Sequence, residues 1–413
     1  MTLAKSRLMN LNYGENGCFT CERVASKIVE THSAPGPNPD FSTELKEALK
    51  APLDFPPLEQ LVVPDDHVTL ALDRDTPEAA TLLAAVWKLL AKRDVHPENV
   101  LILQPPNTTG ANYVDPRGKL PKSVQNRIRW KIHDPSAKNA CRYLSTISSG
   151  ERIYLARDVI NADIVVSIGR IAFDPILGFR GTNSVFFPGL SSEDAAHRAR
   201  GQGHRELRPD DDRPIRQVID EIGWLLGTQF SIQVTPSSDG GVSHVLAGAM
   251  DSVYRHGKQL LTDDWMVQLE FRADIVVAAV ETDAGGHGWE QIGAAVAAAR
   301  NLVAKDGKIV ILSELQAELG EGLDLVRHSE TPGDAIGPLR KMSPSDLTAA
   351  TQLAAAADWA DVYLLSKLES DLVEELFAIP LESECEVSRL LENTGQCAFL
   401  ASAQHTFGLV ESV

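Results

Sequence analysis

Four ionisable side chains stand where predicted strands give way to loops: Asp73, Asp174, Arg180 and His287. In an open parallel sheet, ligands bind outside the carboxyl ends of the strands, because loop amides and helix N-termini converge there. Arg180, in the run GFRGTN, could hold a substrate carboxylate through its planar guanidinium, although a solvated surface arginine is an equal alternative. Asp73 or Asp174 could accept a substrate hydroxyl. We therefore expect these side chains to line one pocket for a small anionic molecule such as a hydroxy acid.

A glycine-rich loop, AGGHGW at residues 284–289, precedes a predicted helix. Its amides and the helix N-terminus could hold a phosphate or carboxylate, with His287 as acid, base or ligand. Such turns are also common before helices, and neither a Walker pattern nor GxGxxG is present. Residues 73–77 likewise form an ordinary helix-capping sequence, whatever else they do. The position of these loops, rather than a specific motif, makes them candidate ligand sites.

The elements that must position these loops follow an α/β order. Short β-rich runs alternate with amphipathic segments at 79–93 and 289–305, which predicts parallel strands connected by helices. The series restarts near residue 266, so we expect two α/β domains with parallel-rich sheets, an N-terminal domain at 1–265 and a C-terminal domain at 266–413. The expected strands lie at 67–72, 99–103, 163–168, 274–280, 308–312, 361–365 and 398–401, and a further helix begins within 349–358.

Composition restricts the partners of the protein. The 413 residues include 39 Lys plus Arg and 57 Asp plus Glu, a formal charge of −18 that disfavours nucleic acid and anionic membrane surfaces. Five cysteines form a sparse, odd set, which indicates a reducing compartment and predicts a cytoplasmic location. Cys18 and Cys21 have the spacing of half a zinc site, but no second pair follows. Two small residues of an edge strand are the simpler interpretation, and no metal site is expected.

An ordered series of segments resembles the nickel-pincer-dependent lactate racemase family of 2-hydroxy-acid racemases and epimerases over nearly the whole chain. The resemblance implies two α/β domains with the active site in the interdomain cleft, in agreement with the argument from strand ends. Lactate or a related hydroxy acid or sugar acid is the substrate class it implies. The segments are LNYG at 11–14, ALKAPLDFPPLEQLV at 48–62, DRDTP at 73–77, RWKIHD at 129–134, TISSGERIYLARDVINADIVVSIGR at 146–170, the glycine and proline pattern of 178–189, and RPIRQVIDEIG at 213–223.

The family cofactor is a covalently attached nickel-pincer nucleotide, and the positions that the resemblance assigns to it are substituted. The tethering lysine falls on Ser184, and the arginine of the family's D-x-T-R-P turn falls on Thr76. A histidine metal ligand falls on Arg200, with His197 and His204 as displaced candidates. A serine hydroxyl cannot form the amide-type linkage that a lysine amine makes. We therefore expect no covalent nickel-pincer cofactor, and any replacement cofactor stays undetermined.

Both catalytic histidines of the family are also replaced. One falls on Asp174, and the other belongs to a loop that reads PPNTTG at residues 105–110. The glutamine and lysine that open the long helix of the second domain fall on Gln291 and Ala295. Gln291, with Trp289 close by, is expected to contact substrate. Because racemisation needs acid/base groups on two faces of the substrate carbon, these substitutions remove most of the family's chemistry.

Two functions remain open. The first is an isomerase-like enzyme, a racemase or epimerase of a 2-hydroxy acid or sugar acid, with altered chemistry in which Asp174 and His287 serve as the acid/base pair. The second is a catalytically degenerate member that binds a small anion or acts in regulation. The first is favoured by the resemblance as a whole, and the second by the loss of the reactive groups while residues typical of the fold are retained.

Overall fold

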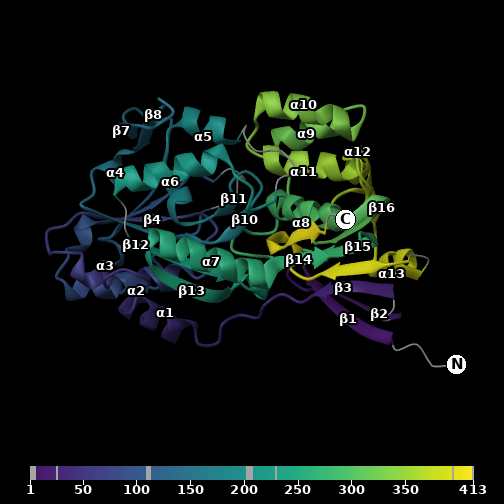
Figure 1. The fold of residues 1–413 in the computed structure, drawn as a ribbon, viewed down its shortest axis with the longest axis horizontal. Coiled ribbons are helices and arrows are strands. Elements are labelled where there is room, and N and C mark those ends of the chain that lie inside the picture. Colours follow the sequence, from purple (N-terminus) through teal and green to yellow (C-terminus); the bar gives the residue numbers. More distant parts are fainter. Residues whose placement is uncertain are drawn as a thin grey trace. The chain divides into compact units, whose positions relative to one another are not determined.

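A computed structural model of the chain describes residues 6–24, 27–107, 113–200, 208–227, 230–392 and 395–411 (Figure 1). The chain forms two compact units: unit 1 comprises residues 1–36, 238–240 and 263–413, and unit 2 comprises residues 37–237 and 241–262. This division differs from the expected boundaries at the N-terminus, because residues 1–36 group with the C-terminal part of the chain. The physical reason is a strand pairing: β3 (Ile28–His32) runs parallel to β19 (Cys397–Leu400) at the edge of the unit 1 sheet.

Unit 2 is built on a six-stranded sheet in the order β13-β12-β9-β4-β5-β6, parallel except for β13. Its inner strands read as apolar runs because both faces are covered. Along β5, for example, Val100 and Ile102 pack into one core while Leu101 and Leu103 pack into the other. The strands are β4 (Val68–Leu72), β5 (Val100–Gln104), β6 (Arg129–Ile132), β9 (Ile164–Arg170), β12 (Phe230–Pro236) and β13 (Val242–Ala249).

Helices and two hairpins surround this sheet. On one face, α2 presents Leu82, Val86 and Leu90 at helical spacing to the sheet, and α1 lies beside it. On the other face, α4, α5 and α6 share a core with the β7–β8 hairpin. The elements are α1 (Phe41–Lys50), α2 (Ala79–Lys92), α3 (Lys122–Gln125), α4 (Arg157–Ile160), α5 (Glu193–Arg200), α6 (Pro214–Leu226), α7 (Met250–Trp265), and the hairpins β7 (Cys141–Thr146) with β8 (Arg152–Ala156) and β10 (Ala172–Asp174) with β11 (Gly178–Arg180).

Unit 1 has a second six-stranded sheet, all parallel, in the order β18-β17-β16-β15-β19-β3. Alternate residues of β15 face opposite cores, with Val276 and Ala278 toward one and Ile275 and Val277 toward the other. The other elements of the sheet and its flanks are β14 (Met266–Leu269), β15 (Ala273–Ala279), β16 (Val303–Leu312), β17 (Asp361–Leu365), β18 (Ile379–Leu381) and β20 (Phe407–Val410).

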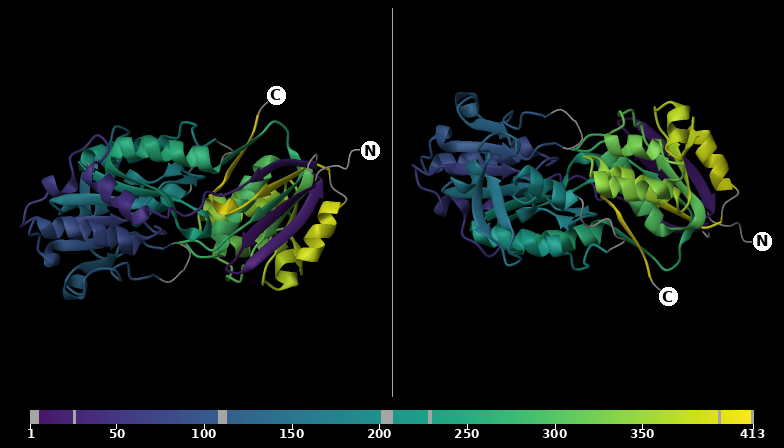
Figure 2. Two further views of the ribbon diagram at one scale, coloured as in Figure 1. Left: turned by 90° about the horizontal axis from the view of Figure 1, so that it is seen from below. Right: turned by 90° about the horizontal axis from the view of Figure 1, so that it is seen from above.

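The two faces of this sheet are covered differently. Five helices, α8 to α12, share the core on one face, and α8 packs so closely on α11 that a β-carbon on Gly293 would lie 2.8 Å from the Ala349 Cα. The β1–β2 hairpin and α13 cover the other face, where Figure 2 shows them in purple and yellow. The covering elements are β1 (Ser6–Tyr13), β2 (Gly17–Val24), α8 (Trp289–Leu302), α9 (Glu321–Arg327), α10 (Pro332–Met342), α11 (Leu347–Ala357), α12 (Ser370–Glu375) and α13 (Glu384–Glu392).

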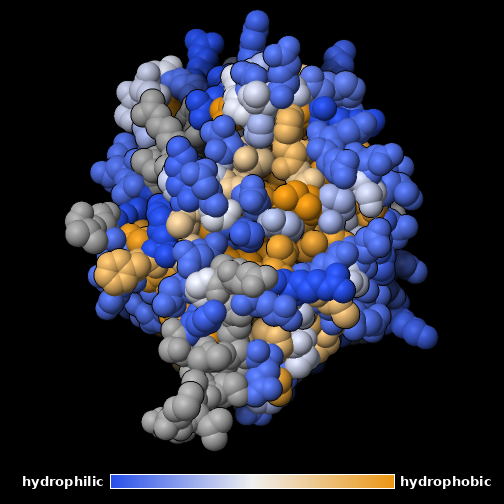
Figure 3. Space-filling view, turned by 90° about the vertical axis from the view of Figure 1, so that its right-hand side faces the viewer, coloured by the Kyte–Doolittle hydropathy of each residue, from blue (hydrophilic) through white to orange (hydrophobic). Residues whose placement is uncertain are grey.

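The described surface is chiefly hydrophilic. Figure 3 shows one face, on which blue side chains surround an apolar strip near the centre. Large apolar side chains that are strongly exposed, such as Trp224 in α6 and Phe271 between β14 and β15, come from separate parts of the chain. Within the described ranges, every helix is too short or too polar to cross a lipid bilayer.

Candidate functional site

At the carboxyl end of the unit 2 sheet, Asp73 and Arg180 form a buried ion pair. Arg180 Nη2 lies 2.9 Å from Asp73 Oδ2, and the two side chains are 11% and 8% exposed. Asp73 follows β4 directly; its amide donates to the Ile168 carbonyl, and its Oδ1 accepts the Arg74 amide at 2.9 Å. Both residues were expected to face a ligand. The structure brings them together and pairs each with the other.

The β10–β11 hairpin positions Arg180. Asp174, at the end of β10, accepts the amides of Ile176 and Leu177 at 2.9 and 2.8 Å, and Gly178 takes the left-handed conformation at φ +79° that closes the turn. Burial by itself would lower the pKa of Arg180, but the charges of Asp73, Asp75 and Asp174 outweigh it and raise that pKa. Arg180 therefore stays a cation, and Asp174 is engaged in forming the turn that carries it.

Asp75 adds a second buried carboxylate two residues after Asp73. Burial would raise its pKa, but the positive charges of Arg170, Arg74 and Arg180 outweigh this and lower it. Arg170 comes from the carboxyl end of β9 and is buried. Asp75 itself has a left-handed backbone at φ +55°, a strained conformation of the kind found at ligand sites. We call Asp73, Asp75, Arg170 and Arg180 the Asp–Arg cluster.

Two of the positions to which the resemblance assigns cofactor residues carry hydroxyls that are engaged locally. Thr76 donates its hydroxyl to the Asp73 carbonyl at 2.7 Å. Ser184, in the 3-10 turn η4 (Thr182–Val185), accepts the amide of Gly181 at 2.8 Å and is buried. Ser184 therefore supplies a hydrogen bond within its own turn and no amine. These residues do not fit a lysine-type covalent attachment of a nickel-pincer nucleotide.

The remaining positions of that set lie on or after α5. Arg200 is the last residue of α5, and His197 is exposed on the same helix, while His204 lies outside the described residues. No group of three His, Cys, Asp or Glu side chains within the described part of the chain has the arrangement of a metal site.

In unit 1, His287 lies in the glycine-rich loop before α8. Its Nε2 accepts the Glu314 amide at 2.9 Å, which requires a neutral ring with its proton on Nδ1. Burial lowers the pKa of His287, in agreement with the neutral form. The loop amides of Gly285 and Gly286 donate to the Asp283 carboxylate and carbonyl, at 2.7 and 2.9 Å. The expected anion cradle is thus occupied by acceptors of the chain itself.

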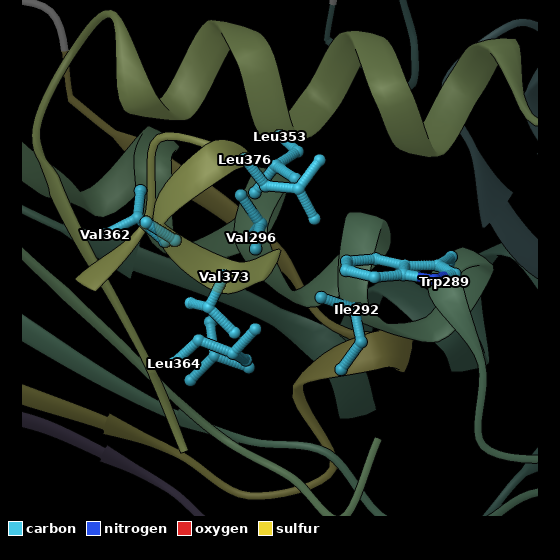
Figure 4. Close-up of a pocket in the computed structure, with 10 residues that line it drawn as sticks. Trp289, Ile292, Val296, Leu353, Val362, Leu364, Val373 and Leu376 are labelled. Atoms are coloured by element: carbon cyan, nitrogen blue, oxygen red, sulfur yellow. The ribbon is translucent and has the colours of Figure 1, made fainter. Parts of the chain in front are cut away.

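Trp289 and Gln291, expected to bind substrate, have structural partners at the start of α8. The Gln291 amide accepts the Gly288 N–H and donates to Asp283 Oδ1, both at 3.1 Å. Trp289 is buried, and its indole N–H donates to the Ala317 carbonyl at 3.3 Å. Its ring borders a small apolar cavity, shown in Figure 4, that is also lined by Ile292, Val296, Ile311, Leu353, Val362, Leu364, Val373, Leu376 and Ala378.

Unit 1 also holds a carboxylate–histidine pair that the sequence did not indicate. His405 Nε2 lies 3.5 Å from Asp283 Oδ2, and these side chains are 5% and 3% exposed. The His405 ring stands edge-on to Trp265, with 5.2 Å between ring centroids. Asp283 follows β15 and His405 follows β19, so the pair lies at the carboxyl ends of two adjacent parallel strands, where ligands commonly bind. Sequence alone does not provide the strand order that brings these two residues together.

Comparisons with known proteins agree with this architecture. The sequence model of the lactate racemase N-terminal domain matches residues 15–204. The fold is similar to the lactate racemase apoprotein of Thermoanaerobacterium thermosaccharolyticum, with a TM-score of 0.80 and 16% identity over 98% of this chain and 100% of that one. A Thermotoga maritima protein matches with a TM-score of 0.64 and 13% identity over 90% of this chain and 98% of that one. A sequence comparison with curated proteins gives no significant match. Residues 15–204 therefore match the lactate racemase N-terminal domain, and the chain as a whole shares the fold of a lactate racemase apoprotein.

Proposed function

We propose that unit 2 binds a small 2-hydroxy carboxylate at the Asp–Arg cluster. Arg180 holds the ligand carboxylate, and Asp73 accepts the ligand hydroxyl. The observation that carries this proposal is the buried Arg180–Asp73 pair at the carboxyl end of the sheet, where parallel sheets bind ligands. Lactate, named for the similar solved structure, has both groups and is the first ligand to test.

The proposed role is binding alone. Racemisation that uses a tethered nickel-pincer nucleotide is not part of it. Ser184 contributes a hydroxyl that already accepts the Gly181 amide. The Asp174 carboxylate accepts two amides of its own turn, and His287 Nε2 accepts the Glu314 amide. Asp174 Oδ1 and His287 Nε2 therefore already accept structural hydrogen bonds, and neither atom can take up a proton while it does so.

An isomerase with altered chemistry is the second candidate, favoured by the match of residues 15–204 to the lactate racemase N-terminal domain. In that function a base such as Asp174 would take the proton from C2, and a second acid/base group would return one to the opposite face. The two functions share the same ligand class and differ in turnover. They also share Arg180, so its substitution reduces either activity.

A thermal-shift screen of hydroxy acids tests the ligand class. It includes both enantiomers of lactate, glycolate, malate and glycerate, with propionate lacking the hydroxyl and propane-1,2-diol lacking the carboxylate. We expect stabilisation only by ligands that carry both groups. Each ligand that stabilises is then repeated with Arg180→Ala and His287→Ala, and with Arg127→Ala as the matched control, since Arg127 forms an exposed ion pair with Glu98.

Binding that Arg180→Ala does not weaken would place the ligand elsewhere and reject the site, whatever the effect of His287→Ala. Incubation of each bound enantiomer, followed by chiral chromatography, separates the two candidate functions. Unchanged enantiomers support the binding protein, and interconversion supports the isomerase.

A further inference from the structure

The Asp–Arg cluster and its nearest charged neighbours are electrically balanced. Asp73 and Asp75 from the turn after β4 and Asp174 from β10 contribute three negative charges. Arg74 from the same turn, Arg170 from β9 and Arg180 from β11 contribute three positive charges. Each of these charges contributes to the shift in the pKa of Asp75 or of Arg180. A ligand carboxylate would therefore bring this buried group from a net charge of zero to −1.

Among the described residues, β12 and η4 place neutral side chains against the cluster. Gln233, from β12, lies beside Gly169 and Gly181 and is neutral, as are Thr182 and Ser184 of η4.

Nearby basic side chains of α6 and α7 and the residue before α6 have their own partners. Arg213 acts on Asp174 but donates to the carbonyls of residues 208, 209 and 211 and faces Asp211. Lys258 pairs with Asp210, and Arg216 pairs with Asp220 at 2.7 Å. Each of these three groups is thus engaged with partners outside the Asp–Arg cluster.

The Asp73 carboxylate cannot move into solvent when a ligand displaces it from Arg180. Its side chain is short and 8% exposed, its backbone amide is bonded to β9, and its Oδ1 holds the Arg74 amide. A β-carbon placed on Gly169 would lie only 3.0 Å from the Asp73 β-carbon, so the side chain lies closely against the neighbouring strand. An unpaired carboxylate at this position would be strongly unfavourable, whereas a protonated carboxyl group would not.

We infer that a monocarboxylate ligand enters the cluster together with one proton, which Asp73 holds as a neutral carboxyl group while the ligand carboxylate takes its place on Arg180. This inference rests on the proposed function and adds to it a coupling between ligand affinity and pH. Atoms and charges balance, since one anion and one proton enter and nothing leaves. The protonated Asp73 can then also donate a hydrogen bond to the ligand hydroxyl.

The coupling has a definite sign. Between pH 6 and 8 a small hydroxy acid is already ionised, so the proton taken up must come from the buffer. The association constant then falls about tenfold for each unit of rise in pH, since one proton is bound with each ligand. Without coupling, affinity would be constant over the same range.

Calorimetric titration of the full chain with lactate in PIPES, MOPS and Tris at pH 7 tests the inference. These buffers differ in ionisation enthalpy. When the observed binding enthalpy is plotted against the ionisation enthalpy of the buffer, the slope gives the number of protons taken up. We expect about one proton for the wild type and for Asp220→Asn, the matched control. For Asp73→Asn, which keeps the shape of the side chain but cannot take up a proton, we expect about zero and pH-independent affinity.

The outcomes separate the two proposals. Binding of lactate with no proton uptake by the wild type would overturn the coupling and leave the proposed function intact. Proton uptake that persists in Asp73→Asn would overturn the assignment to Asp73. If lactate and the other hydroxy acids of the screen all fail to bind, the proposed function fails and the inference fails with it. If Asp73→Asn does not fold, the wild-type buffer series still decides whether binding is coupled.

Discussion

Asp283 and His405 meet at the carboxyl ends of the two adjacent strands β15 and β19, with 3.5 Å between Asp283 Oδ2 and His405 Nε2. The other oxygen of Asp283 accepts the Gly285 amide and the Gln291 side-chain amide. One buried carboxylate therefore joins the loop after β15, the start of α8 and the turn after β19. This makes Asp283 a structural junction of unit 1.

Replacing Asp283 by alanine should lower the free energy of unfolding of unit 1 by about 2 to 4 kcal/mol, because it leaves buried donors without their acceptor. Urea unfolding followed by tryptophan fluorescence measures the loss. Asp371→Ala, at an exposed position in the first turn of α12, is the control and should cost less than about 1 kcal/mol. Equal losses for the two variants would show that Asp283 is not such a junction.

His287 should make stability depend on pH with a predictable sign. Because burial lowers its pKa in the folded protein, the unfolded chain binds a proton more readily, and stability falls as pH drops below about 6.5. The contribution is complete above that value. The loss of unfolding free energy between pH 7.5 and 5.5 should be smaller in His287→Gln than in the wild type. A 15N-edited NMR spectrum of the His287 ring should also show the proton on Nδ1. A proton on Nε2 would contradict the hydrogen bond that Nε2 accepts from the Glu314 amide.

Trp289 should matter for stability and not for ligand binding. Its ring is part of the unit 1 core beside the small cavity lined by Leu353 and Val373. We expect Trp289→Phe to leave the dissociation constant for a bound hydroxy acid within twofold of the wild type. Leu353→Ala enlarges the cavity and should cost about 3 kcal/mol of unfolding free energy. A tenfold loss of affinity in Trp289→Phe would restore the expectation that this residue contacts substrate.

Ser184 should remain unmodified. When the chain is produced together with the enzymes that make the nickel-pincer nucleotide, its intact mass should match the 44.9 kDa given by the sequence. The reason is that the Ser184 side chain offers a hydrogen-bonded hydroxyl instead of an amine. A nucleotide-sized adduct mapped to Ser184 by peptide mass spectrometry is the result that this assignment does not allow.

Much of the fold could be predicted because buried parallel strands leave a strong apolar signal. The expected strand at 361–365 coincides with β17, and the run at 163–168 falls within two residues of β9. The expected helix at 289–305 was too long: α8 ends at Leu302, and β16 begins at Val303, an extended residue where β-branching favours strand. The grouping of residues 1–36 with unit 1 depends on the pairing of β3 with β19, a contact between the two ends of the chain that periodicity cannot reveal.

The candidate site was predicted unevenly for a similar reason. Position at a strand end identified Asp73 and Arg180, but not that each would neutralise the other. Asp75 and Arg170 were not selected, although they complete the cluster, because their burial depends on how the loops fold back. Gln291, from the family resemblance, and Trp289, close to it, were expected to contact substrate. In the structure, the partners of these two residues are Asp283 and the apolar core. The resemblance of a residue to a motif indicates its position in the fold, and its hydrogen bonds determine which chemistry its side chain can perform.

The most direct test of the central claim is the dissociation constant of the hydroxy acid that binds best, measured by calorimetry for the wild type and for Arg180→Met. The proposal that Arg180 holds the ligand carboxylate predicts at least 30-fold weaker binding by the variant, since a charge-assisted pair in a buried site is lost. The double variant Arg180→Met with Asp73→Leu removes the carboxylate that the single variant leaves unpaired, and so controls for a loss of binding caused by misfolding. Arg127→Ala should bind as the wild type does. Binding by both Arg180 variants within threefold of the wild type would contradict the account.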